Sequence, residues 1–161
     1  MRGSSPRMTA EQAAPATKEM GREMRTENIR VKLRDGEMGA YIAYPDKKPV
    51  GAVIAIMEIW GVNDTMRHHA HEFAEAGFVC LVPDLFWRQE PGVELSDKNP
   101  DHVQKAFDLY YEFDYDLGVR DMEDVWHHLE KIPECNGKVG AVGYCLGGRL
   151  AFMTASRTDA D

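Results

Sequence analysis

The chain has 161 residues, 43% of them hydrophobic, which suits one compact domain. Its formal net charge of −8 argues against nucleic acid or an anionic membrane as a partner. No apolar stretch approaches the roughly 18 residues that a membrane-spanning helix needs, and the N-terminus lacks the apolar core of a signal peptide. The three cysteines form no CxxC pair, so the sequence predicts a reducing, cytoplasmic location.

The first part of the chain predicts a tail and a hairpin. Residues 1–25 mix small residues, prolines and scattered charges, so we expect a disordered tail before a single domain over residues 26–161. Apolar and polar residues alternate over 29–33, which indicates a half-exposed strand. Asp35 and Gly36 predict a turn, and residues 38–44 are the expected partner strand.

Beyond the hairpin, strands alternate with helices. Three apolar runs predict strands buried on both faces, at residues 51–57, 78–82 and 138–142. Helical patterns are expected at residues 64–76, 101–113 and 115–131, with a polar loop at 88–99. Asp64 should cap the first helix, and Gly77 should end it. This order predicts an α/β fold with a mostly parallel sheet and helices on both faces.

The sequence GYCLGG at residues 143–148 directly follows the last apolar run. The segment predicts a strand, then a tight turn with Cys145 at its tip, then a helix. This order matches the Gly-x-Ser-x-Gly nucleophile elbow, with cysteine in place of serine. At Gly143 and Gly147, a Cβ atom would collide with the neighbouring strand and helix. The amide of Leu146 would point toward an oxyanion formed at the sulfur. The alternative is a buried structural cysteine in a glycine-rich turn.

Two other groups of polar residues are candidates for function. Glu58 follows the first apolar run, at the carboxyl end of a strand, where open α/β sheets place their sites. By position alone, it could equally be an acid that reaches solvent. His68, His69 and His71 lie on one predicted helix, where the pattern favours a polar helix face over a metal site. We expect neither a metal nor a cofactor.

Three segments resemble the dienelactone hydrolase family: MEIWGVN at residues 57–63, VPDLF at 82–86 and GKVGAVGYCLGG at 137–148. The resemblance covers about residues 27–155. It implies an α/β-hydrolase fold with a Cys-His-Asp triad that opens a small-molecule lactone or ester such as dienelactone. In this family's pattern, Cys145 would attack the carbonyl, and Glu58 would hold the resting thiol neutral and help to form the thiolate. The backbone amides of Ile59 and Leu146 would form the oxyanion hole.

The chain departs from this family pattern in two respects. The acid and histidine of the triad follow the nucleophile in the family, so we expect them beyond Asp161, in a carboxyl-terminal part of the fold that this chain lacks. Near Val103, the family places an arginine that grips the substrate carboxylate, and this chain has none there.

Two other functions remain open from the sequence. One is a truncated, non-catalytic α/β remnant that binds a partner along its open sheet edge. The other is a thiol redox protein that uses Cys145, for which no resolving cysteine lies close in sequence.

Overall fold

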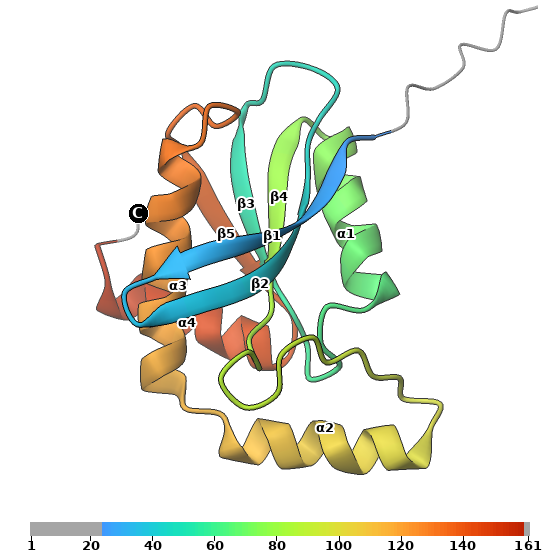
Figure 1. Ribbon diagram of the computed structural model, residues 1–161. Helices are drawn as coiled ribbons and strands as arrows, with labels where there is room; N and C mark the ends of the chain where they lie inside the picture. Colours follow the sequence, from blue (N-terminus) through green and yellow to red (C-terminus); the bar gives the residue numbers. More distant parts are fainter. Residues whose placement is uncertain (1–23, 160–161) are drawn as a thin grey trace, which may run out of the picture.

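The computed structural model describes residues 24–159, so the tail expected at residues 1–25 lies almost entirely outside the described residues. Five strands form one sheet in the order β1-β2-β4-β3-β5 (Figure 1). They are β1 (Thr26–Leu33), β2 (Gly36–Ala43), β3 (Gly51–Ile56), β4 (Phe78–Pro83) and β5 (Val139–Gly143). The helices are α1 (Asp64–Glu75), α2 (Pro100–Glu112), α3 (Tyr115–Lys131) and α4 (Leu146–Arg157).

The sheet combines an antiparallel hairpin with a parallel centre. β1 and β2 pair as the predicted hairpin, and β2 also runs antiparallel to β4. β4, β3 and β5 are mutually parallel, as expected for strands that alternate with helices. Their carboxyl ends therefore meet at one edge of the sheet.

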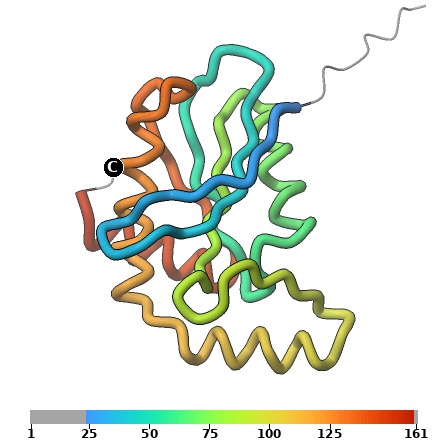
Figure 2. Tube along the Cα trace, in the orientation of Figure 1, coloured from blue at the N-terminus to red at the C-terminus, as the bar shows by residue number. Residues whose placement is uncertain are grey.

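Helices cover both faces of this sheet. α1 packs against β2, β3 and β4, whereas α3 and α4 pack against each other and against β3 and β5 on the other side (Figure 1). α2 lies apart from the sheet, beyond the carboxyl ends of the strands. Figure 2 shows the trace looping below the sheet between β4 and α2. No helix within residues 24–159 is long and apolar enough to cross a membrane.

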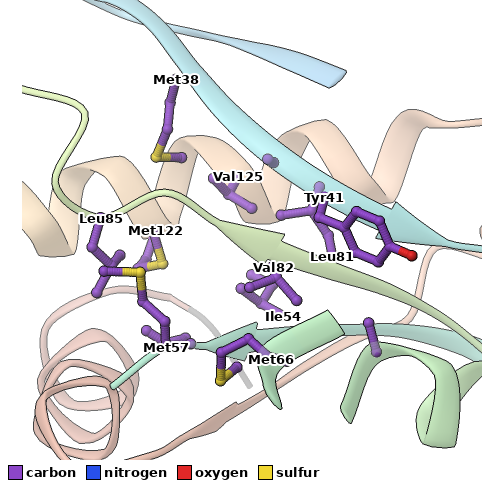
Figure 3. Packing of buried hydrophobic residues seen from close by; sticks show 14 of the residues in the cluster. Met38, Tyr41, Ile54, Met57, Met66, Leu81, Val82, Leu85, Met122 and Val125 are labelled. Carbon is purple, nitrogen blue, oxygen red and sulfur yellow. The ribbon is translucent and has the colours of Figure 1, made fainter. Parts of the chain in front are cut away.

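The core lies where these layers meet. Met66 from α1 and Met122 from α3 are almost fully buried, as are Ile54 and Leu81 in the central strands (Figure 3). Cys80 is also buried in β4, as its apolar run predicted. The flexible methionine side chains fill the space between helix and sheet.

Two local predictions were wrong. The run at 138–142 was expected to be buried on both faces, yet Gly140 and Ala141 of β5 are exposed because β5 has a described neighbour on one side only. Asp64 does not cap α1. The cap is Asn63, whose side-chain oxygen accepts a hydrogen bond from the N–H of Met66 at 3.1 Å, and Asp64 is the first residue of the helix.

A buried acid on α3 joins distant parts of the fold. Asp121 accepts a hydrogen bond from Trp87 Nε1 at 2.9 Å and pairs with Arg88 Nη2 at 2.6 Å. Arg88 also reaches Asp35 at the hairpin turn, at 2.8 Å. The carboxylate of Asp121 thus connects α3, the loop after β4 and the β1–β2 turn.

Replacement of Asp121 by alanine should therefore destabilise the fold, because it leaves the indole N–H and much of the guanidinium of Arg88 unpaired. We expect a loss of about 2–4 kcal/mol in the free energy of unfolding, measured by urea titration. Glu123→Ala is the matched control on the same helix. Glu123 pairs with Arg34 on the exposed surface, so its removal should cost about 0.5 kcal/mol or less. Equal losses for the two variants would contradict this account.

Candidate active site

The turn between β5 and α4 has a strained backbone at Cys145. This residue is the N-cap of α4, with φ 53° and ψ −113°, and it is the only non-glycine residue with positive φ within residues 24–159. Its side chain is exposed, which excludes the alternative of a buried structural cysteine. Such a conformation costs about 1–3 kcal/mol and persists only where the surrounding structure fixes it.

Hydrogen bonds to the end of β3 hold this turn. The N–H of Tyr144 donates to the carbonyl of Ile56 at 3.1 Å, and the N–H of Gly147 donates to the carbonyl of Met57 at 3.1 Å. These bonds come just before and just after Cys145. The backbone of one strand end therefore fixes the strained residue on the next strand.

The flanking glycines allow the close approach that these bonds require. A Cβ atom built on Gly143 would overlap the carbonyl group of Gly147, and one built on Gly147 would overlap the carbonyl oxygen of Ile56. Since these obstacles are backbone atoms, a side chain at either position would force the turn to open.

Helix α1 supports the turn from one side. The ring of His69 stacks on that of Tyr144, with 4.7 Å between centroids and 6° between planes. His69 Nδ1 lies 2.9 Å from a carboxylate oxygen of Glu72. Burial raises the pKa of Tyr144, with smaller contributions from nearby acidic groups. No group of three or more His, Cys, Asp or Glu side chains between residues 24 and 159 is arranged to hold a metal ion.

Parallel pairing brings Glu58 and Cys145 to the same edge of the sheet. Ile56 of β3 is paired with Gly143 of β5, and the two candidates each lie two residues beyond this pair. No hydrogen bond joins the Glu58 carboxylate to the Cys145 thiol within the described part of the chain. The half-buried Glu58 instead lines a pocket of about 390 Å³ next to the first turn of α1, with Trp60, Asn63, Asp64, Thr65, Leu95, Ser96, Asp97 and Lys98.

Backbone contacts with residues 94 and 95 fix the loop that carries Glu58 and Ile59. Gly61 forms an isolated β-bridge with Glu94, and the N–H of Leu95 donates to the carbonyl of Trp60 at 2.8 Å. Gly61 has φ +82°, and a Cβ atom there would overlap the carbonyl of Val93. The loop therefore depends on a segment more than thirty residues later in the chain.

Two backbone donors at this edge are free. Among the described residues, the N–H groups of Ile59 and Leu146 have no hydrogen-bond acceptor. Leu146 is the first residue of α4, so its N–H belongs to the positive end of the helix dipole. Together, the exposed thiol and the free amides can support attack on a carbonyl group whose oxygen becomes negatively charged.

The sequence did not predict several neighbours of the site. Tyr144 was recognised only as part of the elbow, and His69 only as part of a polar helix face. A second pocket of about 370 Å³, lined by Arg30, Tyr41 and Trp87 among others, was not foreseen and contains neither Cys145 nor Glu58. No local pattern marks these contacts, because each joins segments that are far apart in the sequence.

Comparison with solved structures identifies the fold. A putative dienelactone hydrolase from Klebsiella pneumoniae superposes with a TM-score of 0.73 at 21% identity, over 85% of this chain and 56% of that protein. A dienelactone hydrolase from Anabaena variabilis superposes with a TM-score of 0.62 at 17% identity, over 86% of this chain and 61% of that protein. The described strands and helices are thus those of an α/β-hydrolase fold.

Comparison of sequences identifies the family. Carboxymethylenebutenolidase 1 from Cupriavidus pinatubonensis is 37% identical over 139 residues, and a carboxymethylenebutenolidase from Pseudomonas putida is 38% identical over 135 residues. These matches cover 86% and 83% of this chain but only 59% and 57% of the relatives, so the chain spans little more than half of their length. The sequence model described as "Dienelactone hydrolase family" matches residues 38–161. The chain therefore belongs to the dienelactone hydrolase family.

Proposed function

We propose that this chain supplies the nucleophile and the oxyanion hole of a hydrolase that opens a lactone or ester. The observation that carries the proposal is the exposed Cys145, held at positive φ where β5 turns into α4. The relatives named carboxymethylenebutenolidase support a lactone as the substrate. In this proposal, residues 26–161 are the amino-terminal portion of a single hydrolase domain, and the three free cysteines favour the cytoplasm as its location.

The proposed reaction begins with attack of the Cys145 sulfur on the carbonyl carbon. The carbonyl oxygen becomes negatively charged and accepts hydrogen bonds from the free N–H groups of Ile59 and Leu146. Loss of one such donor in a comparable hydrolase costs about 2.7–4 kcal/mol of transition-state stabilisation. The ring C–O bond then breaks, and the ring oxygen keeps the electron pair, stays on the opened chain and takes up a proton. Water hydrolyses the thioester left on Cys145, which releases the acid and regenerates the thiol.

Glu58 is proposed to control the charge of the thiol. It lies at the same sheet edge as Cys145, and a negative carboxylate nearby disfavours the thiolate. The resting thiol would therefore remain neutral. When the substrate enters, rotation of the Glu58 side chain from its pocket toward the sulfur would let the carboxylate accept the thiol proton.

Activation of water is proposed to need a histidine and an acid that follow Cys145 in the family's order. All six histidines of these 161 residues precede the nucleophile. The last of them, His128, lies near the end of α3, where burial lowers its pKa.

Alkylation with limiting iodoacetamide tests the nucleophile. Cys145 should react first, because it is exposed at a helix N-terminus, whereas burial raises the pKa of Cys80 to about 12. Peptide mapping by mass spectrometry would give the rate at each of the three cysteines, with half-buried Cys135 as the internal reference. Labelling of Cys80 ahead of Cys145 in the folded protein would contradict the assignment of Cys145 as the nucleophile.

The substitution Glu58→Gln tests the charge coupling. It removes a negative charge near the sulfur, so the alkylation rate of Cys145 at neutral pH should rise and its pH profile should move to lower pH. Glu37→Gln is the matched control. Glu37 is exposed on β2, so this substitution removes the same charge at a site outside the turn between β5 and α4. Identical profiles for wild type and Glu58→Gln would make Glu58 a bystander.

The number of turnovers tests whether the reaction needs an acid and a histidine that follow Cys145. With an aryl ester, these 161 residues should release at most one equivalent of product as Cys145 is acylated, because loss of the base removes most of the rate in triad enzymes. A longer chain that adds the family's acid and histidine should turn over repeatedly. Multiple turnover by the 161 residues that Cys145→Ala abolishes would show that a histidine before the turn acts as the base.

A further inference from the structure

The loop after β3 is held at two points, one on each side of the free N–H of Ile59. The carbonyl of Met57 accepts a hydrogen bond from the N–H of Gly147 at 3.1 Å, which joins the loop to the turn between β5 and α4. The carbonyl of Trp60 accepts one from the N–H of Leu95 at 2.8 Å, which joins the loop to the chain after β4. The position of the Ile59 N–H relative to the turn therefore depends on where Leu95 lies.

The chain after β4 folds back onto a buried carboxylate. Asp84 directly follows β4 and is only 5% exposed. Its Oδ2 accepts a hydrogen bond from the N–H of Gly92 at 2.7 Å, and its Oδ1 accepts one from the N–H of Phe86 at 3.2 Å. Its own N–H donates to the carbonyl of Gly39 in β2 at 2.9 Å. Asp84 thus fixes the start of residues 92–95, here called the support segment, relative to the sheet.

A second side chain holds the support segment from α1. Nη1 and Nη2 of Arg67 donate to the two carboxylate oxygens of Glu94, at 2.9 and 2.5 Å. Such a bidentate pair fixes direction as well as distance. The guanidinium of Arg67 lowers the pKa of Glu94, so the pair stays charged at neutral pH. Since the backbone of Glu94 forms the bridge with Gly61, this pair holds the support segment where it meets the loop after β3.

An oxyanion hole depends on donors that are already fixed before the reaction. A misplacement of about 1 Å, caused by a change far from the chemistry, can cost about 10²-fold in rate. The N–H of Leu146 is positioned by α4 itself, as its first residue. The N–H of Ile59 lies in a loop, so its position depends on the groups that hold this loop.

We propose that Asp84 and Arg67 are positioning residues that hold the support segment and, through it, the N–H of Ile59 in the oxyanion hole. The inference rests on the proposed roles of Cys145 and Ile59 in the hydrolysis of a lactone or ester. Neither of the two positioning side chains touches the substrate. Their loss should weaken the stabilisation of the oxyanion and leave the reactivity of the Cys145 sulfur unchanged.

Two reactions at the same sulfur separate the oxyanion hole from the nucleophile. In acylation by p-nitrophenyl acetate, the sulfur bonds to the carbonyl carbon, negative charge forms on the carbonyl oxygen, and p-nitrophenolate then leaves with its electron pair. In alkylation by iodoacetamide, an S–C bond forms as iodide leaves, and no oxyanion forms. The quantity measured is the ratio of the acylation to the alkylation rate constant at Cys145, followed by peptide mapping. The thiolate fraction cancels in this ratio.

Asp84→Asn keeps the size of the side chain but leaves one of the two N–H groups without an acceptor oxygen. It should lower the ratio about tenfold, because complete loss of a donor costs about 10²–10³-fold in a comparable hydrolase. Arg67→Gln should lower the ratio about two- to fivefold, as expected for a partly exposed ion pair. Val125→Ala is the control for reduced stability, because it removes buried methyl groups of α3. It should leave the ratio unchanged.

An unchanged ratio in both folded variants, with Cys145 still acylated, would overturn the positioning role alone. An equal fall in Val125→Ala would also overturn it, since reduced stability would then explain the loss. If Asp84→Asn does not fold, Arg67→Gln decides the question, because it changes a partly exposed side chain. A wild-type Cys145 that the ester acylates no faster than Cys80 would overturn the nucleophile and, with it, the premise of this inference.

Discussion

The parallel pairing of β3 with β5 is the constraint on which the rest of the site depends. It places Ile56 beside Gly143 and lets Tyr144 and Gly147 donate to the end of β3. The candidate groups, Glu58, Ile59, Cys145 and Leu146, all lie within three residues of the paired position. The geometry of the site is therefore largely a property of the backbone, and glycines at 143 and 147 are needed so that the two strand ends can approach.

Elements specified by local signals were predicted well from the sequence. The bounds of α3 were predicted as observed, because Asp114 caps the helix and a regular apolar face runs through Val119, Met122 and Val125. Burial depended on neighbours that the sequence does not reveal. The apolar run of β5 resembles that of a central strand, yet β5 lies at the edge of the described sheet, and the placement of β4 between β2 and β3 has no local signature.

In the candidate site, too, features encoded by adjacent residues were predictable and contacts between distant segments were not. The elbow was recognisable because its glycines and cysteine are adjacent in sequence, and Glu58 because it follows a strand. The stack of His69 on Tyr144 and the contact of Arg149 with Tyr115 were not predictable, since each joins residues from different helices or turns. Such contacts depend on the order of the strands in the sheet, because this order determines which helix packs against which strand end.

The bridge between Gly61 and Glu94 ties the long loop after β4 to the backbone that carries the N–H of Ile59. Surface loops usually accept insertions and deletions with little effect. Here, a change of length near residue 94 would shift the backbone of Trp60 and, through it, the neighbouring N–H of Ile59. In the proposed mechanism, variation in that loop would change the position of one of the two amides that bind the oxyanion, a route by which related proteins could diverge in substrate preference.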